Sequence, residues 1–178
     1  PQGAQERSTE VTASHRKTDP ESCLEVLRIG PTYDELITDR VASATTAWYV
    51  QTDGGRQISV GIDSFPDEIG PDLLDRAGAA LGECSAFSMT GLGDTGRFDD
   101  RLWADGRPAP PLGDQGFAVR ITQLAQQDRK TVRLYNDYLV VRAGHNLITV
   151  TVSHWDESMT FQVLQDHATT VLDELEHH

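Results

Sequence analysis

The stretch that decides the fold lies near the C-terminus: FAVRITQL (117–124), TVRLYNDYLVVR (131–142) and LITVTVSHW (147–155). In each segment apolar residues alternate with polar ones, which is the period-two pattern of a half-buried β-strand. AGHN (143–146), between the last two segments, has the residue types of a hairpin turn. Because strands joined by so short a connection pair antiparallel, the sequence predicts an antiparallel sheet.

Further strands are expected toward the N-terminus. AWYV (47–50) and ISVGI (58–62) are strand-like, and DGG (53–55) between them supplies the positive φ that a tight hairpin needs. SAFSM (85–89) is a shorter strand candidate. The sequence then becomes rich in Gly and Asp, which favours a loop before RLWA (101–104).

Three main helices are expected beside the strands. Asp19 and Pro20 are residue types that cap and start a helix, and Gly30-Pro31 ends it. Apolar residues recur at helical spacing from Ile69 to Cys84, and a closing helix is predicted over residues 159–172. TYDE (32–35) matches a capping box and predicts one additional short turn. This order predicts an α+β fold with a single antiparallel sheet of about five to seven strands and helices packed on one side.

The chain divides into one domain with a polar segment before it. Residues 1–18 carry almost no large apolar side chain, so they are expected to form a disordered tether. Residues 19–174 are expected to form a single α+β domain. LEHH (175–178) has the composition of a purification-tag remnant, so its histidines are excluded from functional argument.

The charge restricts the class of partner. Fifteen Lys and Arg against 28 Asp and Glu give a formal net charge of −13, so the field of the protein repels nucleic acid and anionic lipid surfaces. No stretch of the sequence is long and apolar enough for a membrane helix. We therefore expect no nucleic-acid partner, and membrane contact only through a tether or anchor outside this sequence.

Cys23 and Cys84 are the two cysteines of the chain, 61 residues apart and without the spacing of a zinc site. Two interpretations remain open from the residues alone. A pair of buried thiols fits a reducing compartment, because cysteine is often buried. A disulfide fits an oxidising compartment, and closing a loop of this length would contribute about 4 kcal/mol by the chain-entropy relation.

Two motif matches in the Gly- and Asp-rich segment carry little chemistry. GLGDTG (91–96) has the letters of a dinucleotide fingerprint, but no helical period follows it to present backbone N–H groups to a phosphate. Asp94, Asp99, Asp100 and Asp105 supply oxygen ligands without the spacing of an EF-hand loop. A solvated loop is the favoured interpretation, and we expect no metal and no cofactor.

Enzymatic chemistry is not favoured. His154 and Asp156 could form a base and its orienting carboxylate, with Ser153 or Ser158 as the hydroxyl. However, no nucleophile-elbow motif is present, and serine and histidine at strand ends are usually ordinary polar residues. The chain is therefore expected not to be an enzyme.

Aromatic and arginine side chains supply the candidates for ligand recognition, because Trp, Tyr and Arg dominate binding hot spots. Each also has a structural interpretation, since such side chains commonly pack in cores or on strand faces. The candidates, drawn from a wider group that includes Trp48, Trp155, Arg120 and Arg133, are Arg101, Trp103, Tyr135, Tyr138 and Arg142. A hypothetical cleft lies near Trp103, Tyr138 and Arg142.

Several segments, taken in order, resemble the PknH-like extracellular sensor domain family of actinobacteria. They are PESC (20–23), Tyr33, VGIDSFP (60–66), LGEC (81–84), GDQGF (113–117) and YLVVRAGHN (138–146). The resemblance covers about residues 19 to 174 and implies an extracytoplasmic antiparallel sheet flanked by helices, with a cleft for an unidentified ligand. By this likeness Cys23 and Cys84 take the positions of a disulfide. The second cysteine pair of the kinase members is missing here.

The resemblance implies a function and a location. We expect a non-enzymatic sensor or ligand-binding domain, found in this family both on receptor kinases and on free-standing lipoproteins. Its partner would be an unidentified small molecule or cell-envelope ligand. The domain would be extracellular or in the cell envelope, anchored to the outer face of the cytoplasmic membrane. The alternative is a cell-envelope lipoprotein that acts through protein–protein interaction and has no small-molecule site.

Overall fold

The structure is a computed structural model that describes residues 16–27, 36–50, 56–93, 96–127 and 130–177. The predicted helix end at residues 30–31, the capping box at residues 32–35, the hairpin turn at residues 53–55 and most of the predicted tether lie outside the described residues.

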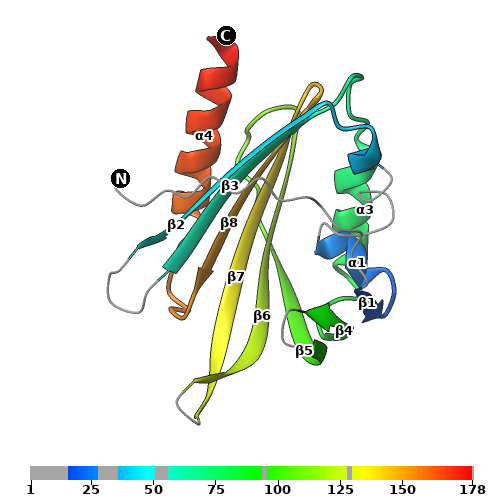
Figure 1. Ribbon diagram of the computed structural model, residues 1–178, viewed down its shortest axis with the longest axis vertical. Helices are drawn as coiled ribbons and strands as arrows, with labels where there is room; N and C mark the ends of the chain where they lie inside the picture. Colours follow the sequence, from blue (N-terminus) through cyan, green and yellow to red (C-terminus); the bar gives the residue numbers. More distant parts are fainter. Residues whose placement is uncertain (1–15, 28–35, 51–55, 94–95, 128–129, 178) are drawn as a thin grey trace.

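The described residues form one antiparallel sheet of eight strands in the order β1-β4-β5-β6-β7-β8-β3-β2 (Figure 1). The antiparallel sheet is confirmed, and the predicted count of about five to seven strands was too low. The bounds are β1 Lys17–Asp19, β2 Ala42–Val50, β3 Arg56–Ser64, β4 Phe87–Gly93, β5 Gly96–Arg107, β6 Gln115–Gln127, β7 Lys130–Ala143 and β8 Asn146–His154.

The expected Gly- and Asp-rich loop is instead a hairpin of β4 and β5. Gly93 pairs with Gly96, and the pairing continues to Phe87 opposite Leu102. A Cβ at Gly91 would lie 2.6 Å from Cζ of Phe98, so glycine is needed there for the aromatic ring to approach the backbone. The sequence did not predict this hairpin because Gly and Asp have low strand propensity. Packing across the sheet outweighs that local preference in the folded protein.

The bounds of the helices differ from those that the sequence pattern indicated: α3 is shorter than predicted, whereas α4 starts and ends later than predicted. They are α1 Cys23–Val26, α3 Asp72–Ala80 and α4 Gln162–Glu176. The first begins at Cys23 rather than at Pro20, and Asp19 belongs to β1 instead of capping the helix. Cys84 follows the end of α3 in a turn, with its N–H donating to the carbonyl of Leu81. No helix among the described residues is long and apolar enough to span a membrane.

The helices cover both faces of the sheet, so the expectation that they pack on one side was wrong (Figure 1). On β7, Val140 packs with the helix residues Leu73 and Leu74 of α3, whereas its neighbour Leu139 packs with Leu164 of α4. Successive strand residues point to opposite faces, which separates the two clusters. We call the face toward α1 and α3 the disulfide face, and the face toward α4 the α4 face.

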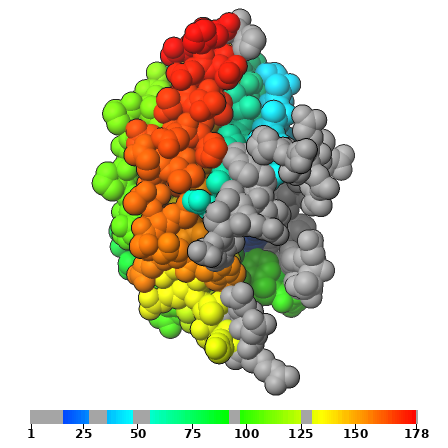
Figure 2. Space-filling model, turned by 90° about the vertical axis from the view of Figure 1, so that its left-hand side faces the viewer, coloured from blue at the N-terminus to red at the C-terminus, as the bar shows by residue number. Residues whose placement is uncertain are grey.

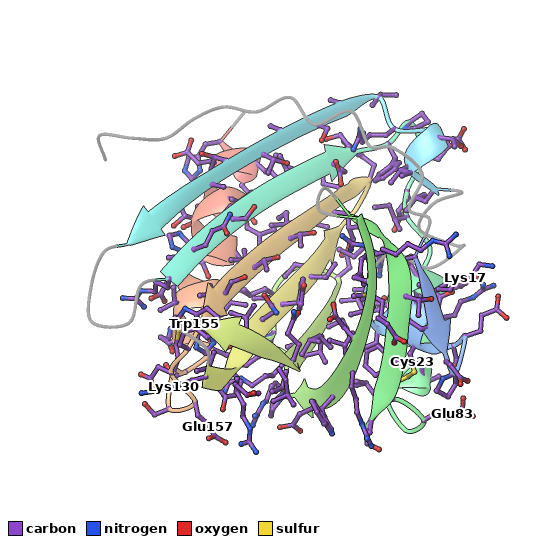
Figure 3. The ribbon with its side chains drawn as sticks, turned by 60° about the horizontal axis from the view of Figure 1, so that its bottom comes forward. Lys17, Cys23, Glu83, Lys130, Trp155 and Glu157 are labelled. Atoms are coloured by element: carbon purple, nitrogen blue, oxygen red, sulfur yellow. A yellow bond between two sulfur atoms is a disulfide. The ribbon has the colours of Figure 1, made fainter. Side chains whose placement is uncertain are left out.

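Cys23 and Cys84 form a disulfide with their Cα atoms 5.6 Å apart, which confirms the predicted pairing. Both residues are fully buried in the core of the disulfide face. Beside the bond, Ser22 Oγ donates to Glu83 Oε2 at 2.9 Å, and Figure 3 shows Cys23 and Glu83 on the same side of the sheet. The bond therefore ties α1 to the turn that follows α3.

The ordered elements reach beyond the predicted domain limits at both ends. β1 begins at Lys17, so the last two residues assigned to the tether pair with β4. At the other end α4 continues through Leu175 and Glu176, which we had assigned to a tag remnant.

Candidate functional site

The five predicted ligand-binding residues lie on two different faces of the sheet. Ala104 on β5 pairs with Ile121 on β6, and both belong to the core of the disulfide face. Leu139 on β7 pairs with Val150 on β8, and both belong to the core of the α4 face. Alternation along each strand then assigns the other residues to a face. The residues on the α4 face are Arg101, Trp103 and Tyr135, whereas Tyr138 and Arg142 are on the disulfide face. The hypothetical cleft near Trp103, Tyr138 and Arg142 would thus need residues that the sheet separates.

Tyr138 and Arg142 have structural surroundings. Tyr138 packs against the core of the disulfide face. Arg142 Nη1 donates to the carbonyl of Ile69 at 2.9 Å, and it lies 3.6 Å from Asp114 Oδ2 and 3.8 Å from Glu68 Oε1. Arg142 thus joins the end of β7 to the two segments beside it.

On the α4 face a row of four residues crosses four neighbouring strands. Trp103 on β5 is opposite Thr122 on β6, Thr122 is opposite Tyr135 on β7, and Tyr135 is opposite His154 on β8. The row runs from a half-buried tryptophan to a buried histidine. The Tyr135 and His154 rings are stacked with their centroids 5.6 Å apart. The row depends on the register of three strand pairs, because a shift of one residue in any of them would move a side chain to the other face.

Beside this row, on the same face, lies a buried ionic network that includes His154. Arg120 Nε donates to Asp137 Oδ1 at 2.6 Å, and Arg120 Nη2 donates to Asp137 Oδ2 at 2.8 Å. His154 Nε2 lies 2.9 Å from the same Oδ2. Because an ionised carboxylate only accepts hydrogen bonds, the Nε2–H of His154 is the donor. The two-pronged contact of Arg120 is the stronger, charge-assisted geometry.

Arg120 also holds the segment that leads into α4. Its Nη1 donates to the carbonyl of Glu157 at 2.7 Å, and its Nη2 donates to the carbonyl of Met159 at 2.8 Å. The guanidinium carbon lies 5.3 Å from the ring centre of Tyr135 and 5.8 Å from that of Phe161. One side chain on the sheet therefore fixes the backbone that places α4 over the α4 face.

The network keeps Asp137 and Arg120 charged. Burial by itself would raise the pKa of Asp137, but the hydrogen bonds from Arg120 and His154 outweigh it and hold that pKa below its ordinary value. The hydrogen bond to Asp137 raises the pKa of Arg120 further above its already high value. A buried pair of this kind is costly to break, because the remaining partner would be an uncompensated charge.

The hypothetical catalytic residues do not come together. Ser153 Oγ donates to Asn136 Oδ1 at 2.6 Å, and Ser158 Oγ donates to Asp156 Oδ1 at 2.8 Å. The carboxylate beside His154 is Asp137, not Asp156. Within the described parts of the chain, no group of three or more His, Cys, Asp and Glu side chains is placed to hold a metal ion.

Sequence reasoning grouped Arg120 with possible ligand-binding residues and did not single out Asp137. A signal was present, because Arg120 stands between the apolar Val119 and Ile121, and Asp137 lies in a strand with apolar residues around it. Charged residues of opposite sign inside two consecutive apolar strands are rarely buried unless they pair. The pairing itself depended on the register that places Arg120 opposite Asp137.

Part of the α4 face is open. α4 contacts β7 and β8, and Figure 2, which looks onto the helix, shows β7 emerging below it. On β5, beyond that contact, the guanidinium of the exposed Arg101 lies 5.7 Å from the ring centre of Trp103. Leu124 on β6 is 48 % exposed on the same face. The open part therefore presents an aromatic ring, a cation and an apolar side chain together.

Comparison with known proteins shows the fold. No protein-family model matches the sequence, and no curated protein matches it. The crystal structure of the extracellular domain of PknH from Mycobacterium tuberculosis is similar with a TM-score of 0.65 and 15 % identity, over 98 % of this chain and 86 % of that chain. A putative uncharacterised protein from Mycobacterium smegmatis (Rv0999 ortholog) reaches a TM-score of 0.36 at 15 % identity, over 88 % of this chain and 74 % of that one. The chain therefore has the fold of the PknH extracellular domain, as its sequence resemblance predicted.

Proposed function

We propose that this chain is an extracytoplasmic, non-enzymatic sensor domain that binds its ligand on the open part of the α4 face. The fold it shares with the extracellular domain of PknH supports a sensor role. The disulfide supports an oxidising location, because such bonds persist outside the cytoplasm. We place the domain outside the cytoplasmic membrane or in the cell envelope, attached to the membrane through a segment beyond this sequence.

The observation that carries the ligand site is the row from Trp103 to His154. Its outer end is accessible, since Trp103 is half-buried and Arg101 beside it is exposed. Its inner end is held by the Arg120–Asp137 pair and the Tyr135–His154 stack. An accessible indole and guanidinium on a rigid sheet form a preorganised recognition surface, which loses little conformational entropy on binding.

The chemistry of this surface indicates the class of ligand. The indole of Trp103 offers a flat apolar face, Arg101 offers N–H donors, and Thr122 on the neighbouring strand offers a hydroxyl. Such a set suits a ring-shaped, hydroxyl-bearing molecule of the cell envelope, with a carboxylate or phosphate for Arg101. The net charge of −13 disfavours large polyanions such as nucleic acids.

A non-catalytic role is supported by the way the reactive groups are used. Asp137 and Arg120 neutralise each other in the core, and the Nε2 of His154 is occupied by Asp137. The serines that flank His154 in sequence bond to Asn136 and Asp156. These side chains therefore serve the fold, and none of them forms the nucleophile–base pair that acyl-transfer chemistry needs.

The test is a titration of the isotope-labelled chain with soluble saccharides and muropeptides released from an actinobacterial cell envelope, followed by NMR. We expect at least one probe to shift the signals of Trp103 and its neighbours. Trp103→Ala should then raise the Kd at least about tenfold, as expected for loss of a central aromatic contact. Trp155→Ala is the matched control, because Trp155 is also accessible, at 38 % exposure, and directly follows β8, which is three strands away from Trp103 on β5.

Equal loss of binding in both tryptophan variants would contradict the site. If no probe shifts any α4-face signal, the second candidate function is favoured, in which the domain acts through protein–protein interaction alone. One observation already favours that candidate. Val41, directly before β2, is 65 % exposed and lies at the border of the sheet.

A further inference from the structure

The two edges of the sheet differ in how they are protected. β1 forms one edge with three residues, two of them charged, and Pro20 follows. β2 forms the other edge with nine residues, ASATTAWYV, which include no charged residue and no proline. Native proteins usually protect edge strands by keeping them short or by adding charges, proline or bulges. β1 follows this rule, and β2 does not.

The interactions that hold the β2 edge within the described part of the chain come from its inner side. Among the described residues β2 pairs along its whole length with β3, and with no other strand. Arg40 Nη1 and Ser43 Oγ both donate to Asp63 Oδ1 on β3, at 3.0 and 2.7 Å. Residues 41–45 are exposed, and Figure 3 shows β2 as the outermost strand of the sheet. Its outer backbone groups thus form a preorganised template for another extended chain.

We propose that β2 pairs antiparallel with β2 of a second copy of this chain, joining the two sheets around a twofold axis at Thr46. In such a symmetric contact each residue meets a residue of its own strand. A charged strand would bring like charges together there, and β2 has none. The pairing also sets the small residues Ser43 and Ala44 of one copy opposite Tyr49 and Trp48 of the other.

The strength of the dimer follows from its small contact and the total charge. A contact limited to two strands lies at the low end of interface sizes, so a Kd in the micromolar range is expected. Two copies with −13 each repel one another at long range. Raising the ionic strength from about 20 to about 300 mM should therefore strengthen the dimer, whereas salt weakens contacts made by opposite charges.

The first experiment is sedimentation velocity of the full chain from about 5 to about 500 µM, at low and at moderate salt. We expect a reversible monomer–dimer equilibrium that salt shifts toward the dimer. Amide hydrogen exchange in β2 should slow as the concentration rises, while exchange in β1 stays unchanged. A chain that stays monomeric throughout this range overturns the proposal.

The second experiment changes the residue at the proposed axis. Thr46→Lys and Thr46→Glu each place two like charges directly opposite one another, so each should raise the dimer Kd at least about tenfold. Mixing the two variants should restore a heterodimer, a result that misfolding cannot produce. Thr90→Lys is the control, because Thr90 is an exposed threonine on β4 and away from the β2 edge. Dimerisation that survives both Thr46 changes, or a mixture that stays monomeric, would overturn the assignment.

Discussion

The disulfide face and the α4 face of this sheet are closed by different chemistry. On the disulfide face a covalent bond ties α1 to the turn after α3, above a core of apolar side chains. On the α4 face Arg120 joins the sheet to the carbonyls of Glu157 and Met159, next to a smaller apolar cluster. Losing either partner of the second closure leaves an uncompensated buried charge, whereas breaking the first closure leaves none.

This difference also bears on the proposed ligand site. The disulfide face is covered by two helices, and its predicted ligand residues Tyr138 and Arg142 are engaged in packing or hydrogen bonds. The α4 face has one helix over β7 and β8, which leaves Trp103 and Arg101 accessible on β5. A rigid polar network next to an open aromatic surface is the arrangement that positions binding groups well.

Removing Asp137 should destabilise the protein more than removing the disulfide. Asp137→Ala should lower the free energy of unfolding by about 3–5 kcal/mol, because Arg120 would remain buried without its partner. The control is Asp105→Ala on the same face, since Asp105 forms an exposed ion pair with Arg107 and should cost less than about 1 kcal/mol. Urea unfolding measures both. Equal effects of the two changes would show that the network does not close the α4 face.

The next effect concerns the disulfide face. Replacing both Cys23 and Cys84 with serine should lower the free energy of unfolding by about 3 kcal/mol, since the unfolded chain gains the freedom of the open loop. The α4 face should keep its structure, so the Arg120 side-chain signals in NMR spectra should move little. Loss of the Arg120 signals in this variant would indicate that the two closures depend on one another.

The smallest expected effect is a pH dependence that belongs to the α4 face. Despite burial, the hydrogen bonds from Arg120 and His154 lower the pKa of Asp137 in the folded state, so its charge contributes stability above the unfolded pKa, and this is lost as the pH falls through the folded pKa. Between about pH 4 and pH 2 the free energy of unfolding should therefore fall more steeply for the parent chain than for Asp137→Asn. The difference in slope should be at most about 1.4 kcal/mol per pH unit.

Urea unfolding at several pH values measures this slope for the parent chain and for Asp137→Asn. The other carboxylates titrate in both of these proteins, so the difference between the two slopes isolates Asp137. The variant without the disulfide keeps Asp137 and serves as a comparison, with the slope of the parent chain expected. Parallel slopes for the parent chain and Asp137→Asn would contradict the assigned direction of the pKa shift.

Much of the strand content could be predicted, because alternation of apolar and polar residues is a local property. β6, β7 and β8 follow from it directly, and the helix that closes the chain follows from apolar residues at helical spacing, which is also a local pattern. β5 escaped because Gly96, Asp99 and Asp100 are poor strand formers, and only pairing with β4 and β6 makes a strand of that segment. Three of the predicted ligand-binding residues, Arg101, Trp103 and Tyr135, lie on the α4 face, and their role in binding stays a prediction. The buried Arg120–Asp137 pair was missed.

By itself the sequence determined the antiparallel strands, the two cysteines available for a bridge and the resemblance to a known extracellular fold. Alternation along β7 also places Tyr135 and Tyr138 on opposite faces, although the sequence analysis had grouped them in one ligand-binding set. Only the tertiary structure decided that helices cover both faces, that Arg120 meets Asp137, and that Trp103 and His154 end the same row. The reason is that alternation is local, whereas register and face depend on contacts between segments far apart in the chain.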